Sequence, residues 1–287
     1  MTAVARLAVV GTGLIGGSFA LAARRAGLVG EVVGFGRRRE HLELARSRGV
    51  IDRIAVSLAE AADADVILLG APVGVCAELA RGLRPHAPAA TVLTDVGSVK
   101  ARLVADLEDA WGGGSHVVGA HPIAGSEQTS VAAAHGDLFV GRRCVLTPTR
   151  DTGAPALALV RALWEGVGAV VEEMDARYHD ALLARVSHAP HLIAYALVDA
   201  VGGWTHGADA LAHAGSGFAD TTRIAGSAAE LWRDIVLANA PAVRAALAEF
   251  RATLGAFDDA LARGDAAALD DLMERARRTR GRVGGGS

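Results

Sequence analysis

The chain has 287 residues, enough for one large domain or two ordinary ones, and 51% of them are apolar. Its formal net charge of −3 gives no reason to expect nucleic acid, because phosphate binding depends on clustered Lys and Arg, and Lys100 is the only lysine. Cys76 and Cys144 lie far apart in no metal-ligand spacing. This spacing argues against a disulfide framework or a metal site and fits a reducing, cytoplasmic location.

The amino-terminal segment leads almost directly into a strand-like run at 7–10, without a cationic and apolar leader ahead of it. No uninterrupted apolar run reaches the roughly 18 residues of a membrane-spanning helix. We therefore expect neither a secretory leader nor a membrane partner.

Short apolar runs alternate with amphipathic stretches up to about Met174. Apolar strands separated by helices are typical of parallel βαβ units whose sheet is covered on both faces. The expected strands are 7–10, 32–35, 66–70, 92–94, 117–119, 144–147 and 170–172. The expected helices between them include 18–26, 39–48, 100–111 and 155–165.

After Met174 the alternation stops and helical patterns take over. These patterns are 175–201, interrupted by Pro190, and then 229–238, 242–263 and 267–278. The fold class is therefore α/β, with a Rossmann-type parallel-sheet domain at 1–174 and an all-α domain at 175–283, followed by a flexible tail at 284–287. The helices are apolar over broad faces, which indicates burial on more than one side and favours a homodimer through the helical domain.

A glycine motif follows the first expected strand and opens a helix. It consists of Gly11, Thr12, Gly13, Leu14, Ile15 and Gly16. In a strand–turn–helix context, such glycines permit the tight turn, the approach of the backbone to a pyrophosphate and close helix–strand packing. The helix N-terminus then faces the anion. The motif predicts a dinucleotide site, and the alternative is a glycine-rich turn without a ligand.

The end of the second expected strand indicates which dinucleotide binds. NAD sites usually have a carboxylate there, which holds the ribose hydroxyls, whereas this chain has Gly36 followed by Arg37, Arg38 and Arg39. Cations at the start of a helix are disfavoured by the helix dipole unless an anion is present, and a ribose 2′-phosphate would supply one. We therefore expect NADP in preference to NAD, with a solvated charge run as the alternative.

Polar residues gather where two further strands are expected to end. Ser98 follows the strand at 92–94, and His121 follows the strand at 117–119. Ligands of open α/β sheets sit beyond the carboxyl ends of the strands, so both side chains are expected in the site. The helical part carries two more polar groups, at 187–191 and 220–225.

Five motifs in this order resemble those of the prephenate/arogenate dehydrogenase family, over nearly the whole chain. They are Gly-Thr-Gly-Leu-Ile-Gly-Gly-Ser at 11–18, Asp-Val-Gly-Ser-Val-Lys at 95–100, His-Pro-Ile-Ala-Gly-Ser-Glu at 121–127, Ser-His-x-Pro-His at 187–191 and Asp-Thr-Thr-Arg-Ile-Ala at 220–225. The resemblance implies oxidative decarboxylation of prephenate to 4-hydroxyphenylpyruvate in tyrosine biosynthesis, with hydride transfer to NAD(P)+ and no metal.

The resemblance also implies roles for single residues. His121 accepts the proton of the substrate 4-hydroxyl, a role that suits a neutral imidazole, while Ser98 orients His121 and the nicotinamide. His191 and Arg223 bind polar groups of the substrate, and Arg223 suits a carboxylate because its guanidinium can bind it through two hydrogen bonds. The remaining substrate-binding candidates are Glu127, Asp220 and Trp232.

Several alternatives remain open. The substrate is expected to be prephenate, but arogenate or a 4-amino analogue would also fit, since Glu127 or Asp220 could face a side-chain amine. A β-hydroxyacid dehydrogenase would need a lysine in the helical part, and a pyrroline-carboxylate reductase would not explain residues 121–127. A non-catalytic NADP-binding sensor is an alternative of a different class.

For some single residues a structural role is an alternative to a role in the site. Ser98 could cap the helix at 100–111, and His188 is expected to be structural. Arg223 could form a surface ion pair with Asp220, and Trp232 could belong to the core.

Overall fold

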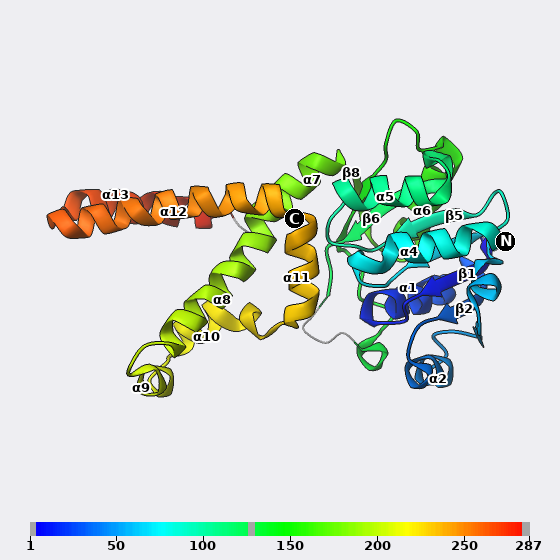
Figure 1. Ribbon diagram of the computed structural model, residues 1–287, viewed down its shortest axis with the longest axis horizontal. Helices are drawn as coiled ribbons and strands as arrows, with labels where there is room; N and C mark the ends of the chain where they lie inside the picture. Colours follow the sequence, from blue (N-terminus) through cyan, green and yellow to red (C-terminus); the bar gives the residue numbers. More distant parts are fainter. Residues whose placement is uncertain (1–3, 126–129, 283–287) are drawn as a thin grey trace. The chain divides into compact units, whose positions relative to one another are not determined.

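The computed structural model describes residues 4–125 and 130–282. Two compact units are present, 1–240 and 241–287. The first contains the sheet and the helices up to α11, and the second contains the last two helices (Figure 1).

One sheet of eight strands forms the centre of the first unit, counted over the described residues. The strands are β1 (Val4–Val10), β2 (Val29–Phe35), β3 (Arg53–Ile54), β4 (Val66–Leu69), β5 (Val92–Asp95), β6 (Val117–Pro122), β7 (Arg143–Thr147) and β8 (Val170–Glu173). Their order is β3-β2-β1-β4-β5-β6-β7-β8. The first six follow the doubly wound order, in which strands are added outward on either side of the β1–β4 boundary and ligands bind in the crevice there.

Helices cover both faces of this sheet, as continuous apolar strands require. Alternate residues of β1 point to opposite faces, so Leu7 and Val9 belong to one core cluster while Ala8 and Val10 belong to the other. The first cluster includes side chains of α1 (Leu14–Arg25), α2 (Arg39–Ser47) and α6 (Ala154–Gly166). The second includes side chains of α3 (Leu58–Ala62), α4 (Val73–Leu83) and α5 (Ala101–Trp111). The α/β prediction is confirmed.

The pairing of β7 departs from the all-parallel expectation. β6 and β7 run antiparallel, with His121 opposite Val145, whereas β7 and β8 are again parallel. A parallel neighbour requires a crossover, usually a helix. Among the described residues between β6 and β7, the only helical turn is the short η3 (Val131–Ala133), so the chain returns in the opposite direction.

The long helix expected at 175–201 is present, but it is irregular just before Pro190 and not at Pro190 itself. α7 (Ala176–Leu183) passes through a π-helical turn, η4 (Ala184–His188), into α8 (Ala189–Gly202). Pro190 stands in the first turn of α8, and the irregular turn precedes it. Since proline has no N–H to donate, the helix widens just before it. π-Turns of this kind frequently occur at functional sites.

Shorter helices complete the first unit: α9 (Gly207–Ala212), α10 (Ser216–Thr222), η5 (Arg223–Gly226) and α11 (Ala229–Ala238). The second unit consists of α12 (Ala240–Arg263) and α13 (Ala266–Arg280). Gly264 has a φ of +63° at the turn between them, and Asp265 caps α13 by accepting a hydrogen bond from the N–H of Ala268 at 3.0 Å.

By length and composition alone, the described residues contain one helical stretch that could cross a membrane, 176–202. Its first turns carry His179 and Asp180, which are buried against the sheet. Ionisable groups are expensive inside a bilayer. The first turns of this stretch therefore pack inside the unit, while 28% of its most apolar 18-residue window is buried.

Candidate active site

The glycine motif lies at the point where the strand order reverses. Gly11 has a φ of +103°, and a Cβ on it would lie 2.6 Å from the backbone of Gly70 at the end of β4. A Cβ on Gly16 would lie 2.4 Å from the carbonyl oxygen of Gly11. Neither position admits another residue without movement, so both glycines are required by close backbone packing.

The N-terminus of α1 is open to an anion. Gly13 is the N-cap, and no side chain caps the helix there. The first N–H groups of a helix have no partner within it, and α1 begins just after β1, where Gly11 packs against Gly70 at the end of β4. This arrangement fits the pyrophosphate of a dinucleotide.

The end of β2 is built as the sequence suggested. Arg37 and Arg38 are exposed, and Arg39 pairs with Glu43 of its own helix at 2.9 Å. A Cβ on Gly36 would meet only Leu42, at 3.7 Å, so nothing in this structure forbids a side chain at that position. With glycine at position 36, no carboxylate lies at the expected ribose position. The two exposed guanidiniums of Arg37 and Arg38 follow it in the chain.

His121 stands at the end of β6 and is 8% exposed. Its Nδ1 lies 2.8 Å from Nε2 of His179, a residue of α7. Burial, followed by the charges of His179, Lys100 and His188, lowers the pKa of His121 well below 6.5. The imidazole is therefore neutral near pH 7, as a proton acceptor must be. A Cβ on Gly125, four residues later, would lie 3.8 Å from Cδ1 of Ile15, so this segment returns to the glycine motif.

Asp180 connects His121, through His179, to the start of α5. Its Oδ1 lies 2.8 Å from Nδ1 of His179, and its two carboxylate oxygens accept hydrogen bonds from the N–H groups of Lys100 and Ala101 at 2.8 and 2.9 Å. These are the first N–H groups of α5, so Asp180 caps that helix from a position 80 residues later in the chain. The alternative role of Ser98 as the cap of this helix is not seen, because Lys100 is the N-cap and no side chain of the N-cap residue caps the helix.

The sole lysine is structural. Lys100 is fully buried, and its Nζ contacts Oδ2 of Asp95 and donates to the carbonyl oxygen of Ala120 at 2.7 Å. Asp95 in turn accepts from the N–H groups of Gly97 and Ala120. This buried pair fixes the ends of β5 and β6, and with them the backbone that carries His121.

A second group of side chains comes from the helices that follow. The His191 ring stacks on Trp232 of α11, with centroids 3.3 Å apart and planes 20° from parallel. The ring of His188 meets the edge of the same indole at 6.1 Å. The charge of Arg223 contributes to a lowered pKa of His191, after the larger effect of burial, so these two side chains are close. Trp232 therefore packs against the rings of both histidines.

His188 and Asn239 tie the cluster to α7. The side-chain amide of Asn239 donates to the carbonyl oxygen of Asp180 at 2.8 Å and lies 3.1 Å from Nδ1 of His188. Burial lowers the pKa of His188 to about 4, against a weaker upward effect of Asp180. The backbone of Ser98 also acts on this ring, which places Ser98 beside it.

The predicted site residues are thus only partly brought together. His121 is joined to His179 and Asp180, while His188 and His191 both meet Trp232. Asp220 is exposed on α10, and none of the contacts described above places it in the cluster. Glu127 lies outside the described residues. Sequence reasoning missed His179, Asp180 and Asn239, for which the one available signal was a His-Asp pair early in a helix.

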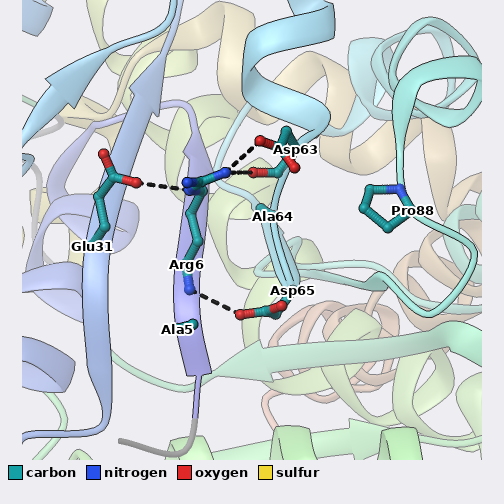
Figure 2. A pocket seen from close by; sticks show the side chains of 7 residues that line it. All are labelled: Ala5, Arg6, Glu31, Asp63, Ala64, Asp65 and Pro88. Carbon is teal, nitrogen blue, oxygen red and sulfur yellow. Dashed lines mark hydrogen bonds and ion pairs between the residues drawn. The ribbon is translucent and has the colours of Figure 1, made fainter.

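A separate hollow lies at the opposite, amino-terminal ends of β1, β2 and β4. Figure 2 shows Arg6 between Glu31, which accepts from its Nε at 2.7 Å, and Asp63, while Asp65 accepts from the Arg6 backbone N–H at 2.9 Å. The hydrogen bond from Arg6 is the largest cause of the lowered pKa of Glu31. Because the Arg6 charge is already neutralised, this network links strand ends and offers no anion site.

Comparison with known proteins agrees with this geometry. The family description "Prephenate dehydrogenase, nucleotide-binding domain" matches residues 19–173, and "Prephenate dehydrogenase, dimerization domain" matches residues 175–275. The chain belongs to the prephenate dehydrogenase family. Membership makes it a nicotinamide-dependent dehydrogenase and removes the non-catalytic sensor from consideration.

Individual relatives match along most of their length. A cyclohexadienyl dehydrogenase of Zymomonas mobilis is 34% identical over 279 residues, covering 96% of this chain and 93% of the relative. The structure of a prephenate dehydrogenase from Aquifex aeolicus, in complex with hydroxyphenyl propionate and NAD+, is 36% identical with a TM-score of 0.93, covering 97% and 98% of the two chains. A Synechocystis arogenate dehydrogenase structure is 30% identical with a TM-score of 0.82, covering 96% and 99%.

Proposed function

We propose that this protein oxidises prephenate to 4-hydroxyphenylpyruvate with loss of CO2, in tyrosine biosynthesis. His121 carries the proposal, because it is a buried, neutral imidazole at the end of a sheet strand. It accepts the proton of the 4-hydroxyl while the nicotinamide cofactor, when bound, accepts the hydride from C4. The electrons of the broken bond to the ring carboxylate then complete the aromatic ring.

The second cluster supports the same reaction. His191 and Arg223 would hold the substrate carboxylates, and Trp232 stacks on the His191 ring. Ser98 lies beside His188, where it can contact substrate or cofactor. Glu127 and Asp220 remain candidates at the entrance. Holding reactants in line in this way can lower the barrier by several kcal/mol, up to about 7–11 kcal/mol in well-oriented systems.

The experiment is a turnover assay that follows absorbance of the reduced nicotinamide with prephenate, and identifies 4-hydroxyphenylpyruvate and CO2 as products. Formation of both in equal amounts with the reduced cofactor is expected. Reduced cofactor without CO2 would contradict the proposal.

Arogenate is the second candidate substrate, favoured by the likeness to the Synechocystis arogenate dehydrogenase. It differs from prephenate in having an amino group where prephenate has a keto group. A 4-amino analogue of prephenate is the third. Values of kcat/KM measured side by side on the three compounds rank them, and we expect prephenate first.

The proposed cofactor is NADP, through the residues Gly11, Thr12, Gly13, Leu14, Ile15, Gly16, Gly36, Arg37, Arg38 and Ser98. Exposed guanidiniums of Arg37 and Arg38 would bind the 2′-phosphate. The substitution Gly36→Asp introduces the missing carboxylate into available space and should raise the KM for NADP at least tenfold while lowering that for NAD. Arg37→Ala should raise only the NADP value. Equal use of both cofactors by the parent enzyme would contradict this assignment.

We also propose a cytoplasmic homodimer, with nucleotide binding in 1–174 and dimerisation through 175–283. Large apolar side chains are exposed on the helices of both units, as a helical interface requires. They include Leu197 and Leu211 in the first unit and Phe250, Leu254 and Leu261 in the second. Light scattering should give twice the mass of 29.3 kDa. A monomer at micromolar concentration would contradict the dimer.

A further inference from the structure

Three side chains form a buried line that ends at the proposed proton acceptor. Nδ1 of His121 faces Nε2 of His179 at 2.8 Å, and Nδ1 of His179 faces Oδ1 of Asp180 at 2.8 Å. His179 is fully buried, and the other two residues are nearly so. The line joins β6 to α7, so it forms only when the sheet and the first helix of the helical part pack together.

Asp180 fixes the direction of the hydrogen bonds along this line. Its carboxylate already accepts from two backbone N–H groups at the start of α5. Burial alone would raise the pKa of Asp180, but the hydrogen bonds from His179, Ala101 and Lys100 lower it below 3.8. An ionised carboxylate can only accept, so Nδ1 of His179 carries a proton and donates it to Oδ1.

The next bond follows from the first. A neutral imidazole has one donor and one acceptor nitrogen. With its proton on Nδ1, a neutral His179 has a bare Nε2, which must accept from Nδ1–H of His121. His121 then has its lone pair on Nε2, and that nitrogen is the one available to take a proton.

The surrounding charged groups do not compete for these bonds. Lys100 is held by Asp95 and by the carbonyl oxygen of Ala120. His188 has Nδ1 beside the amide of Asn239. Cys144, opposite Pro122 in β7, is a buried free thiol.

We propose that His179 and Asp180 are positioning residues that hold His121 as its Nδ1–H tautomer, with Nε2 turned to the substrate hydroxyl. The proposal rests on the proposed function for the identity of the proton donor. In the reaction, the hydroxyl proton moves to Nε2 and His121 becomes an imidazolium. Its Nδ1–H remains bonded to His179, and Asp180 remains a carboxylate that stabilises the new charge through His179. No further proton transfer is required.

The first test reads the tautomer directly and needs no substrate. Enzyme labelled with ¹⁵N at histidine gives nitrogen shifts that distinguish protonated from bare ring nitrogens, and the His121 signals are identified by their loss in His121→Asn. We expect a protonated Nδ1 and a bare Nε2 at neutral pH. The reverse tautomer overturns the proposal, because His179 would then be an imidazolium that donates to His121.

The second test separates positioning from folding with a pair of variants. In His179→Gln the side-chain carbonyl can accept from His121, whereas His179→Leu removes the acceptor at similar size. We expect kcat to fall about 100-fold in the Leu variant and less than tenfold in the Gln variant, with both KM values within threefold of the parent. Equal losses in the two variants, or none in either, would overturn the proposal.

Asp180→Asn provides the strongest form of this test. The amide would donate to Nδ1 of His179, so that Nε2 of His179 carries the proton and donates to Nδ1 of His121. Both hydrogen bonds then run in the opposite direction, and the His121 proton lies on Nε2. A switched ¹⁵N signature together with a loss of kcat is expected, and an unchanged tautomer would count against the proposal. His86→Gln, at an exposed histidine, is the control and should match the parent. If the parent shows the expected tautomer but does not oxidise prephenate, the proposed function fails while the tautomer assignment stands.

Discussion

The glycine motif at 11–16 and the histidine cluster are built in different ways. The histidine cluster consists of His121, His179, His188 and His191 with Trp232. The glycine motif occupies six consecutive residues, and its geometry depends on local backbone contacts with β4. The histidine cluster draws on β6, α7, the π-turn, α8 and α11, and its members are up to 111 residues apart in the case of His121 and Trp232. A local site can be read from a sequence, whereas an assembled one is specified only by how the elements pack.

The largest effect that would sharpen this contrast is the loss of the proton acceptor. His121→Asn should lower kcat by about 1,000-fold, within the range for removal of a general base, because asparagine cannot take up the hydroxyl proton. Cofactor binding, which depends on the distant glycine motif, should stay within twofold when measured by fluorescence of the reduced nicotinamide. If turnover survived, the assembled site would lie elsewhere.

The next prediction concerns stability below neutral pH, which only the histidine cluster should affect. The pKa of His188 is about 4 in the folded protein and near 6.5 in the unfolded chain. The unfolded chain therefore binds a proton that the folded protein does not, and stability falls by up to about 3 kcal/mol as pH drops from 6.5 to 4. Asp180, whose folded pKa lies below 3.8, adds a further loss only below that pH.

Thermal unfolding measured across this pH range checks the prediction. The Tm of the parent should fall most steeply between pH 6.5 and 4, and His188→Asn should show a shallower dependence. Identical slopes for parent and variant would show that His188 does not carry the effect.

A third prediction addresses the glycine motif itself. Gly11→Ala should cost about 1–3 kcal/mol of stability or abolish cofactor binding, since φ is +103° and the added Cβ meets the Gly70 backbone. Gly215→Ala is a matched control, because that glycine has a φ of −88° and open space around it. Denaturant unfolding and nicotinamide titration measure the two effects. A Gly11 variant as stable as the control, with normal cofactor affinity, would break the argument for a tight turn.

The smallest expected effect belongs to the aromatic stack. Trp232→Leu keeps an apolar side chain but removes the stacking partner of His191, which is worth about 0.5–1.5 kcal/mol. The KM for prephenate should rise roughly threefold to tenfold, with kcat changed less, because the ring orients substrate and takes no part in proton transfer. An effect on kcat alone would assign Trp232 a different role.

The sequence by itself determined seven of the eight strands described, the glycine motif where the strand order reverses and the placement of His121 at a strand end, but it missed the two-residue β3. Each follows from local periodicity or from residues adjacent in the chain. The antiparallel return of β7 was not predicted, because strand direction depends on what connects the strands across space. The long helix was predicted, but its π-turn was not.

Only the tertiary structure decided which groups surround His121. His179 and Asp180 carry no recognisable motif, and they matter because α7 brings them against β6 and the first turn of α5. Likewise, only the tertiary structure stacks Trp232 on His191. Hydrogen bonds between side chains require donor–acceptor distances of about 3 Å. No sequence pattern predicts which elements far apart in the chain come that close.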